Sequence, residues 1–424
     1  MSMKRMHWVA AVSLLMAGTC LAQTTAPATK GELKAGDFVA VCGDSITEQK
    51  QYSVIIEEYL LMCQPAANLR TLQAGWSGEQ AAGFRGRMAD DVLPLKPTVT
   101  TTCYGMNDGG YTALSADRAA TYRTNTTEIV KKFKEAGVRL IVVGSPGVVD
   151  SETFKRGQEV YNETLTKLRD IAAEVAAEQG VVFADVNTPM KDVMAKAKEK
   201  WGKNYAVAGG DGVHPGYNGH LVMAYAFLKA LGCDGNVGTI TVDLATGKAD
   251  ATAGHKVTGS EKGSVSLEST KYPFCFFGEA KDSNSAKGVL EFLPFNEELN
   301  RLTLVAKGVD AAKKYRVTWG AANHEFNGAE LAKGVNLAAA FADNPFSEAF
   351  KKVDAVVRHQ QNFETNLTKQ MLHGLGQIRA ELPGDQATVD AVVEKLAARD
   401  KVRADASRAA VEPVTHTVKI EVVE

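Results

Sequence analysis

The residues best suited by type and context to carry out a reaction are Ser45, in the run GDSIT, and His214, in the run DGVHP. A serine hydroxyl is a weak nucleophile until a base removes its proton, and a neutral imidazole suits that task near pH 7. A carboxylate assists the imidazole by fixing its tautomer and by stabilising the cation that forms. Asp211 lies three residues before His214, so a tight turn brings its carboxylate to the ring Nδ1. We therefore interpret Ser45, His214 and Asp211 as nucleophile, base and partner of the base.

Attack by such a serine on a carbonyl creates an oxyanion, which needs donors that are already in place. The predicted donors are the backbone N–H groups of Ser45 and Gly78 and the side-chain amide of Asn107. Gly78 follows Ser77 in a turn, and Asn107 lies in the run GMND. Gly75, in the same turn as Gly78, is the alternative glycine.

Other residues near these runs are weaker candidates for a functional role. Asp44, Trp76 and Tyr111 are candidates for the substrate pocket, although Asp44 is more readily explained as a residue that stabilises its turn. Ordinary packing is the alternative for the two aromatic residues. His220 lies more than one helical turn beyond His214, and we expect it to have a surface or packing role. No cysteine–histidine spacing is typical of zinc, and we expect neither a metal nor a cofactor.

A scaffold must bring these separate loops together. Apolar or β-branched runs predict strands at 38–42, 71–73, 98–103, 138–143 and 181–184. Helical spacing of apolar residues predicts helices at 54–62, 119–136, 158–178 and 218–231. Strands that alternate with helices of this length predict a parallel sheet with helices on both faces. Right-handed crossovers then place the strand ends that carry the candidate residues on one edge of the sheet.

As a set, the GDS run, the Ser77-Gly78 turn, the GMND run and the DGVHP run resemble the four sequence blocks of the SGNH, or GDSL-type, hydrolases. The resemblance covers about residues 37–231. It implies a flavodoxin-like three-layer α/β/α fold and hydrolysis of acyl esters without a metal. Position by position, it implies that Ser45 is the nucleophile, that Gly78 and Asn107 are oxyanion donors, and that His214 is the base with Asp211 as its partner.

The chain from residue 235 lies outside this resemblance. Strand-like runs separated by turn residues predict a small antiparallel unit: 238–244, 255–257, 264–269, 301–305 and 315–319. The alternating run 418–422 is expected to return to this unit as a strand. Apolar residues at helical spacing over 345–382, a break at 383–385 and a second helix over 387–403 predict a helical hairpin.

The predicted organisation is therefore a signal peptide (1–22), a lead-in linker (23–36), a hydrolase-like domain (37–234) and a C-terminal accessory region (235–424) with a hairpin at about 345–403. Lys4, Arg5, an apolar stretch and a small-x-small site before Gln23 predict the signal peptide. The apolar stretch is too short for a bilayer span. We therefore expect export to the periplasm or the exterior, and no integral membrane protein.

A net charge of −2 and a pI of about 6.5 argue against nucleic acid or an anionic membrane as the main partner. Five cysteines remain after the predicted cleavage: Cys42, Cys63, Cys103, Cys233 and Cys275. We expect buried free thiols. A bridge between Cys42 and Cys103 is the alternative, because both lie near the ends of predicted core strands.

These features predict an exported serine esterase that removes short acyl groups, with acetyl as the expected group. Carbohydrate as the substrate is what export, the appended β unit and the resemblance to the family imply. The glycine-rich loops offer no apolar tunnel for a long acyl chain. A lipase or lysophospholipase and a sugar O-acyltransferase are alternatives that use the same site. A polysaccharide-binding protein of the cell envelope, which is not primarily an enzyme, is the alternative from a different functional class. The natural substrate and the oligomeric state stay open at this point.

Overall fold

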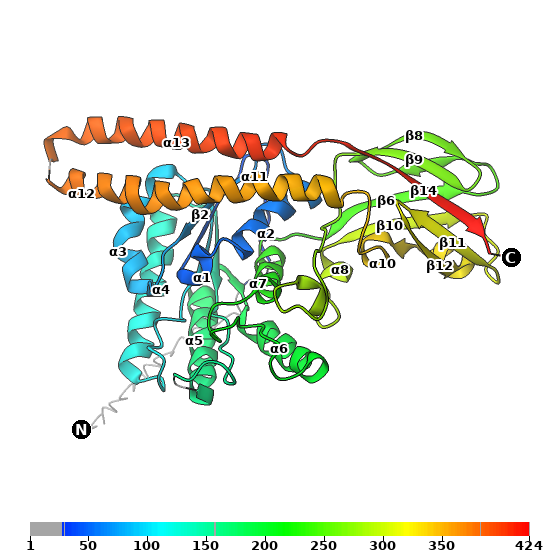
Figure 1. Cartoon of the computed structure of the whole chain (residues 1–424). Coiled ribbons are helices and arrows are strands. Elements are labelled where there is room, and N and C mark those ends of the chain that lie inside the picture. Colours follow the sequence, from blue (N-terminus) through cyan, green and yellow to red (C-terminus); the bar gives the residue numbers. More distant parts are fainter. Residues whose placement is uncertain (1–27, 29, 157, 382, 424) are drawn as a thin grey trace, which may run out of the picture.

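The computed structural model describes residue 28 and residues 30–156, 158–381 and 383–423. An α/β domain stands beside a region of β-sheets, and two long antiparallel helices run across the α/β domain (Figure 1). The predicted signal peptide, residues 1–22, lies outside the described residues. In the described ranges, no helix has both the length and the apolar character needed to cross a membrane.

The α/β domain is built on a five-stranded sheet whose strands all run parallel, in the order β2-β1-β3-β4-β5. The strands are β1 Phe38–Gly43, β2 Arg70–Gly75, β3 Val99–Cys103, β4 Leu140–Gly144 and β5 Val182–Ala184. Nearly every strand residue is buried, as expected for a parallel sheet covered on both faces. This strand order is flavodoxin-like and confirms the predicted fold class.

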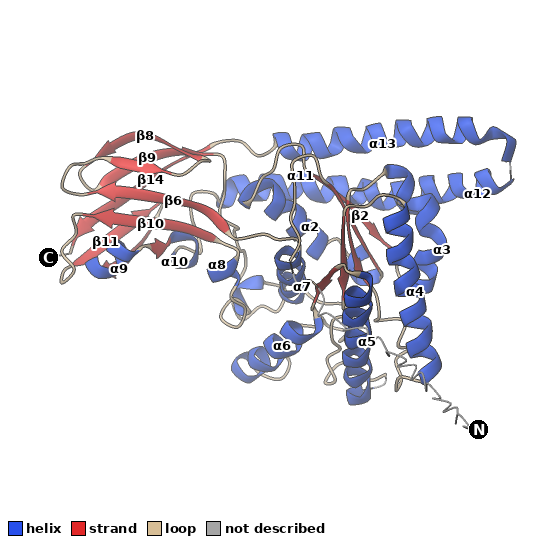
Figure 2. Cartoon of the chain, turned by 180° about the vertical axis from the view of Figure 1, so that it is seen from behind, coloured by secondary structure: helices blue, strands red, loops and turns tan. Residues whose placement is uncertain are grey.

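Helices cover both faces of this sheet (Figure 2). They are α1 Ser45–Glu48, α2 Tyr52–Glu58 with its π-helical extension η1 Tyr59–Cys63, α3 Ala81–Asp91, η2 Leu93–Leu95, α4 Ala116–Glu135, α5 Gln158–Gln179, α6 Asn187–Trp201 and α7 Tyr217–Ala230. The sequence did not predict α3 as a helix. Gly83 and Gly86 weaken the helical signal of α3, whose Phe84 and Met88 are nevertheless fully buried. Tertiary packing therefore stabilises a segment whose own helix propensity is low.

The alternative of a Cys42–Cys103 disulfide is wrong. All five of the cysteines predicted to be buried free thiols are free and buried. The register between β1 and β3 pairs Cys42 with Thr102, and Gly43 with Cys103. Because successive strand residues point to opposite faces, the two thiols enter the hydrophobic clusters on opposite sides of the sheet.

The region after residue 235 contains two sheets, in the orders β13-β10-β6-β7 and β12-β11-β14-β9-β8. Its strands are β6 Asn236–Asp243, β7 Ala249–Ala251, β8 His255–Glu261, β9 Ser264–Ser269, β10 Arg301–Lys307, β11 Lys314–Trp319, β12 Ala322–Asn327, β13 Val335–Asn336 and β14 Val414–Val422. Its short helices are η3 Ala286–Gly288, α8 Phe295–Glu298, α9 Gly328–Lys333 and α10 Leu337–Ala340. The predicted return of the C-terminal strand is confirmed, because β14 pairs with β9 and β11.

The prediction of a purely antiparallel unit is wrong, since β6 and β10 pair in parallel. A parallel pair needs a long crossover connection, and the segment that includes β7, β8 and β9 supplies it. Buried and exposed residues alternate along β6 and β10, and the same alternation is expected whether two strands pair in parallel or antiparallel. The sequence pattern therefore reveals the buried face but not the direction of pairing.

The predicted helical hairpin is confirmed. Its first arm consists of α11 Ser347–Asn366, the π-helical turn η4 Leu367–Leu372 and α12 His373–Glu381. After the turn η5 Pro383–Asp385, the second arm is α13 Gln386–Ala409. The Glu364 carboxylate of α11 accepts the Gln73 backbone N–H of β2 at 2.7 Å. The hairpin thus supplies a hydrogen-bond acceptor to a backbone N–H of β2, which is an edge strand of the sheet. An edge strand with unpaired N–H groups could otherwise pair with a strand of another chain.

A set of buried carboxyl groups joins the hairpin to the α/β domain. Glu57, Glu364 and Asp400 are each no more than 2% exposed. Burial raises the pKa of Glu57 to about 7 and that of Asp400 to about 6, although Arg70 and Arg403 partly oppose the rise at Asp400. Burial also raises the pKa of Glu364 well above its usual value. These groups therefore hold protons in the folded protein at a pH where the unfolded chain has released them.

We expect the free energy of unfolding to fall as the pH rises from about 5 to about 8. A group with a raised folded-state pKa stabilises the protein fully below its unfolded pKa and loses that contribution as the pH passes its folded pKa. Glu57→Gln removes one such group, so the free energy of unfolding, measured by urea titration, should vary less with pH, by roughly 1–3 kcal/mol over this range. Glu394→Gln, an exposed site on α13, is the control and should leave the slope unchanged. A Glu57→Gln slope equal to that of the wild type would contradict the expectation.

Candidate active site

Ser45 lies at the first position of α1, directly after β1. Asp44 caps this helix, because its Oδ1 accepts the Ile46 N–H at 2.9 Å. The turn requires glycine at position 43, where a Cβ would lie 2.0 Å from the Thr47 hydroxyl oxygen. Since β1 and β3 adjoin where the strand order reverses, Ser45 lies at the edge where open α/β sheets bind ligands.

The loop before α7 brings an imidazole to this serine. The Ser45 Oγ lies 2.8 Å from the His214 Nε2, although 169 positions separate the two residues in the chain. The other ring nitrogen of His214, Nδ1, lies 2.7 Å from Asp211 Oδ2. Asp211 Oδ1 accepts the backbone N–H groups of Val213 and His214, each at 2.9 Å. The aspartate is therefore fixed by the turn that also carries the histidine.

Electrostatics favour a charged Asp211. Its partial burial raises the pKa, but the hydrogen bonds from His214 and Val213 outweigh this effect and leave the pKa below its usual value. The side chains of His214 and Asp211 are 37% and 57% exposed, so this pair lies at an open rim. A substrate can reach the site without passing through a closed channel.

The three predicted oxyanion donors are the N–H groups of Ser45 and Gly78 and the side-chain amide of Asn107. Gly78 has a left-handed backbone, with φ of +74°, and a Cβ there would meet open space. Among the described residues, the N–H groups of Ser45 and Gly78 donate to no backbone or side-chain acceptor. The Asn107 Nδ2 lies 3.1 Å from the Glu79 carbonyl oxygen and 3.4 Å from Asp44 Oδ2. The rival glycine, Gly75, is packed at the end of β2, where a Cβ would lie 2.3 Å from the Glu48 nitrogen.

The remaining pocket candidates surround these donors. The Tyr111 hydroxyl donates to the Asn107 Oδ1 at 2.9 Å, which orients the amide so that its Nδ2 faces Asp44. Trp76 is half-buried, with its ring 5.1 Å from the His373 ring. Burial raises the pKa of Asp44 to about 7, although the Ile46 N–H opposes the rise.

His220 is fully buried and stacks on Tyr52. Burial lowers its pKa to about 3, so it is neutral at ordinary pH. Its Nε2 lies 3.0 Å from Gln49 Oε1. These contacts give His220 a packing role, as the sequence indicated.

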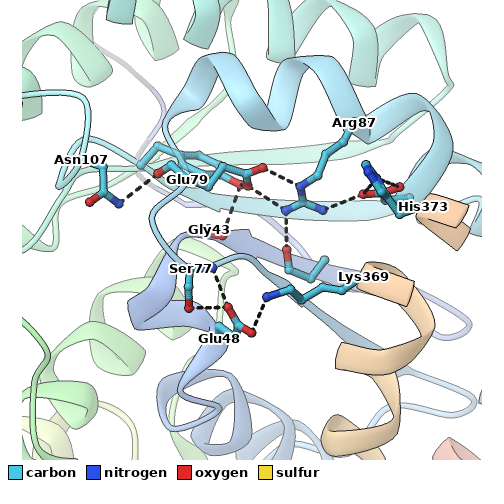
Figure 3. Close-up of polar contacts among 11 residues, drawn as sticks. Gly43, Glu48, Ser77, Glu79, Arg87, Asn107, Lys369 and His373 are labelled. Carbon is cyan, nitrogen blue, oxygen red and sulfur yellow. Dashed lines mark hydrogen bonds and ion pairs between the residues drawn. The ribbon is translucent and has the colours of Figure 1, made fainter. Parts of the chain in front are cut away.

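The sequence reading missed a network of charged side chains behind the donors (Figure 3). Arg87 of α3 makes two bonds to the Glu79 carboxylate, at 2.6 and 2.8 Å. Lys369, from the hairpin, contacts Glu48. The proximity of Glu79 to Gly78 in the chain was the only available signal, because Lys369 and Glu48 are 321 positions apart.

The arrangement supports nucleophilic chemistry on a carbonyl group. It combines a hydroxyl in contact with an imidazole, a carboxylate behind the imidazole, and an amide donor, Asn107, in contact with Asp44, the residue before the serine. Within the described part of the chain, no group of three or more His, Cys, Asp or Glu residues is placed to hold a metal ion.

A model of the GDSL-like lipase/acylhydrolase family matches residues 41–222. Residues 41–222 form a GDSL-like acylhydrolase domain. The chain is accordingly a carboxylic ester hydrolase. The acylhydrolase domain contains Ser45, Gly78, Asn107, Asp211 and His214, whereas the β-sheet region and the hairpin lie outside the match.

Two relatives extend this comparison. An acetylxylan esterase of Geobacillus stearothermophilus is 21% identical over 211 residues, which cover 46% of this chain and 91% of that protein. The solved structure of a gut microbial diltiazem-metabolizing enzyme has a TM-score of 0.71 and 23% identity, and the match covers 94% of this chain and all of the other. The second likeness shows that the acylhydrolase domain, the β-sheet region and the hairpin recur together as one fold.

Proposed function

We propose that this protein is an exported serine esterase that removes short acyl groups, acetyl above all, from carbohydrate. The observation that carries the proposal is the 2.8 Å contact between the Ser45 hydroxyl and the His214 Nε2, with Asp211 behind the ring. Distances of this kind are what a nucleophile and its general base require.

The proposed reaction has two steps. Ser45 Oγ bonds to the acyl carbon as its proton passes to His214 Nε2, and Asp211 stabilises the imidazolium that results. The N–H groups of Ser45 and Gly78 and the Asn107 amide bind the oxyanion. His214 then protonates the departing alkoxide, which leaves as an alcohol, and an acyl-Ser45 ester remains. In the second step, His214 takes a proton from water, the hydroxide attacks the acyl carbon, and Ser45 recovers its proton as the acid is released.

Two features support a small acyl group and a large alcohol. Ser45 and the rim residues Asp211 and His214 are partly exposed, and Gly78 is exposed, which leaves room for a bulky alcohol portion. The similarity to an acetylxylan esterase supports acetylated carbohydrate as the substrate class. The predicted signal peptide supports export, which would be tested by sequencing the N-terminus of the mature protein; retention of residues 1–22 would contradict it.

We expect hydrolysis of p-nitrophenyl esters to fall as the acyl chain lengthens, with acetate at least about tenfold faster than octanoate in kcat/KM. A tenfold difference in kcat/KM corresponds to about 1.4 kcal/mol of transition-state stabilisation. A longer acyl chain gains no burial energy where no apolar wall receives it, so nothing compensates for its added bulk at the serine. Release of acetate from acetylated xylan should accompany this preference.

Faster hydrolysis of octanoate than of acetate would favour a lipase or lysophospholipase instead. Transfer of acetyl to added xylose in preference to water would favour an acyltransferase. Tight binding to deacetylated xylan with no esterase activity would favour a polysaccharide-binding protein. Each of these results would overturn the proposal.

A further inference from the structure

The C-terminal hairpin reaches the loop that carries Gly78. The Lys369 ammonium, from η4, donates to Glu48 Oε1 at 2.6 Å. The second oxygen of the same carboxylate, Oε2, accepts the Ser77 backbone N–H at 2.5 Å and the Ser77 hydroxyl at 2.6 Å. Figure 3 shows this path from the hairpin, through Glu48 of α1, to the loop after β2. One carboxylate therefore connects a residue of the accessory region to the residue directly before Gly78.

These bonds control the direction of a peptide group. The Glu48 carboxylate fixes Ser77 at both its backbone nitrogen and its side chain. The torsion of Ser77 sets the direction in which the Gly78 N–H points. Gly78 itself cannot supply this restraint, because it has no side chain and the space around it is open. The direction of the Gly78 donor thus depends on how firmly Glu48 is held.

Lys369 is suited to hold Glu48. The side chains of Lys369 and Glu48 are 19% and 20% exposed, so their charges are largely shielded from water and salt. Partial burial raises the pKa of Glu48, but the bonds from Lys369 and Ser77 outweigh it and leave the pKa below its usual value. The Lys369 ammonium also lies 4.9 Å from the centre of the Trp76 ring, at the start of the same loop.

The other side of the loop is held in a similar way. Glu79 follows Gly78, and its carboxylate is bound by Arg87. Arg87 contacts Asp91 at 3.4 Å, and Asp91 contacts His373 of the hairpin at 3.2 Å. The Glu79 carbonyl oxygen accepts the Asn107 amide at 3.1 Å. Residues that reach back to the hairpin therefore flank Gly78 on both sides.

We propose that Lys369 is a positioning residue for catalysis, which orients the Gly78 oxyanion donor through Glu48 and Ser77. The inference rests on the proposed esterase function. It gives the C-terminal hairpin a part in turnover that the 41–222 family match does not assign.

The test compares Lys369→Met, which keeps an unbranched apolar side chain but removes the ammonium, with Lys369→Arg, which keeps the charge. We expect Lys369→Met to lower kcat for p-nitrophenyl acetate by about tenfold with KM within about twofold, because a misdirected donor weakens transition-state binding selectively. Lys369→Arg should retain at least about half of the wild-type kcat. Glu48→Gln should resemble Lys369→Met, and the double variant should lose little more, since the two residues act in one chain.

Lys401→Met is the matched control. Lys401 lies on the same hairpin, and its ion pair with Asp405, at 2.7 Å, is confined to α13. This variant should match the wild type in kcat and KM. If Lys369→Met fails to fold, Glu48→Gln removes the same link from the domain side and decides the question.

A second readout does not depend on turnover. Selective ¹⁵N labelling of glycine, with the Gly78 amide peak assigned by its loss in Gly78→Ala, reports the environment of the donor. The Gly78 peak should shift in Lys369→Met and not in Lys401→Met. A folded Lys369→Met variant with wild-type kcat and an unmoved Gly78 peak would overturn the inference while leaving the esterase function intact. Absence of Ser45-dependent hydrolysis in the wild type would overturn both.

Discussion

Ser45→Ala is expected to lower kcat/KM for p-nitrophenyl acetate by roughly four to six orders of magnitude. The variant retains the donors and the His214–Asp211 pair but lacks the oxygen that must bond to the acyl carbon. No other hydroxyl is placed to substitute, because among the described side chains the His214 Nε2 makes its hydrogen bond to the Ser45 Oγ. The residual rate would come from water activated by His214 and from oxyanion binding.

The measurement is the initial rate of p-nitrophenol release, together with labelling by a fluorophosphonate probe. Mass spectrometry should place the adduct on Ser45 in the wild type and find none in Ser45→Ala. Ser260→Ala is the control, since Ser260 is exposed on β8 in the accessory region. Equal rates for Ser45→Ala and the wild type would remove the assignment of Ser45 as nucleophile.

Asp211→Asn is expected to lower kcat by roughly two to four orders of magnitude with little change in stability. The asparagine oxygen can still accept the backbone N–H groups of Val213 and His214, so the turn should survive. The amide NH₂ would then face His214 Nδ1 in place of the carboxylate oxygen now 2.7 Å away. Because that nitrogen would have to accept a hydrogen bond, the proton would move to Nε2. His214 could then no longer take the proton of Ser45.

The chain offers a close control for this substitution. Asp185 also accepts a backbone N–H three residues further on, from Thr188 at 3.0 Å, at the end of β5. Asp185→Asn makes the same change of side chain in a similar turn that does not adjoin His214. We expect it to keep the wild-type kcat. Comparable kcat values for Asp211→Asn and Asp185→Asn would show that the carboxylate does not act on the imidazole.

Much of the site could be predicted because its determinants are local in the chain. Phe38–Gly43 is apolar throughout, and the next two residues are a helix-capping aspartate and a serine. Asp211 and His214 are three residues apart, so one turn is sufficient to join them. The alternation of such strands with helices also indicated the parallel sheet, which brings distant loops to one edge.

Other features were decided only by contacts between distant segments. Periodicity showed that Cys42 and Cys103 lie in buried strands, but only the register placed their thiols on opposite faces of the sheet. The same patterns could not show that β6 and β10 run in parallel.

The hairpin was visible in the sequence as two helices, whereas its position against the α/β domain was not. Glu48 and Lys369 carry charges that, taken singly, fit any solvated helix face. The sequence by itself determined the reactive groups and most of the secondary structure, with α3 as an exception, because backbone preference and side-chain spacing act between near neighbours. The tertiary structure alone decided which charges meet, because such contacts depend on how separately formed elements pack, and no local pattern records that.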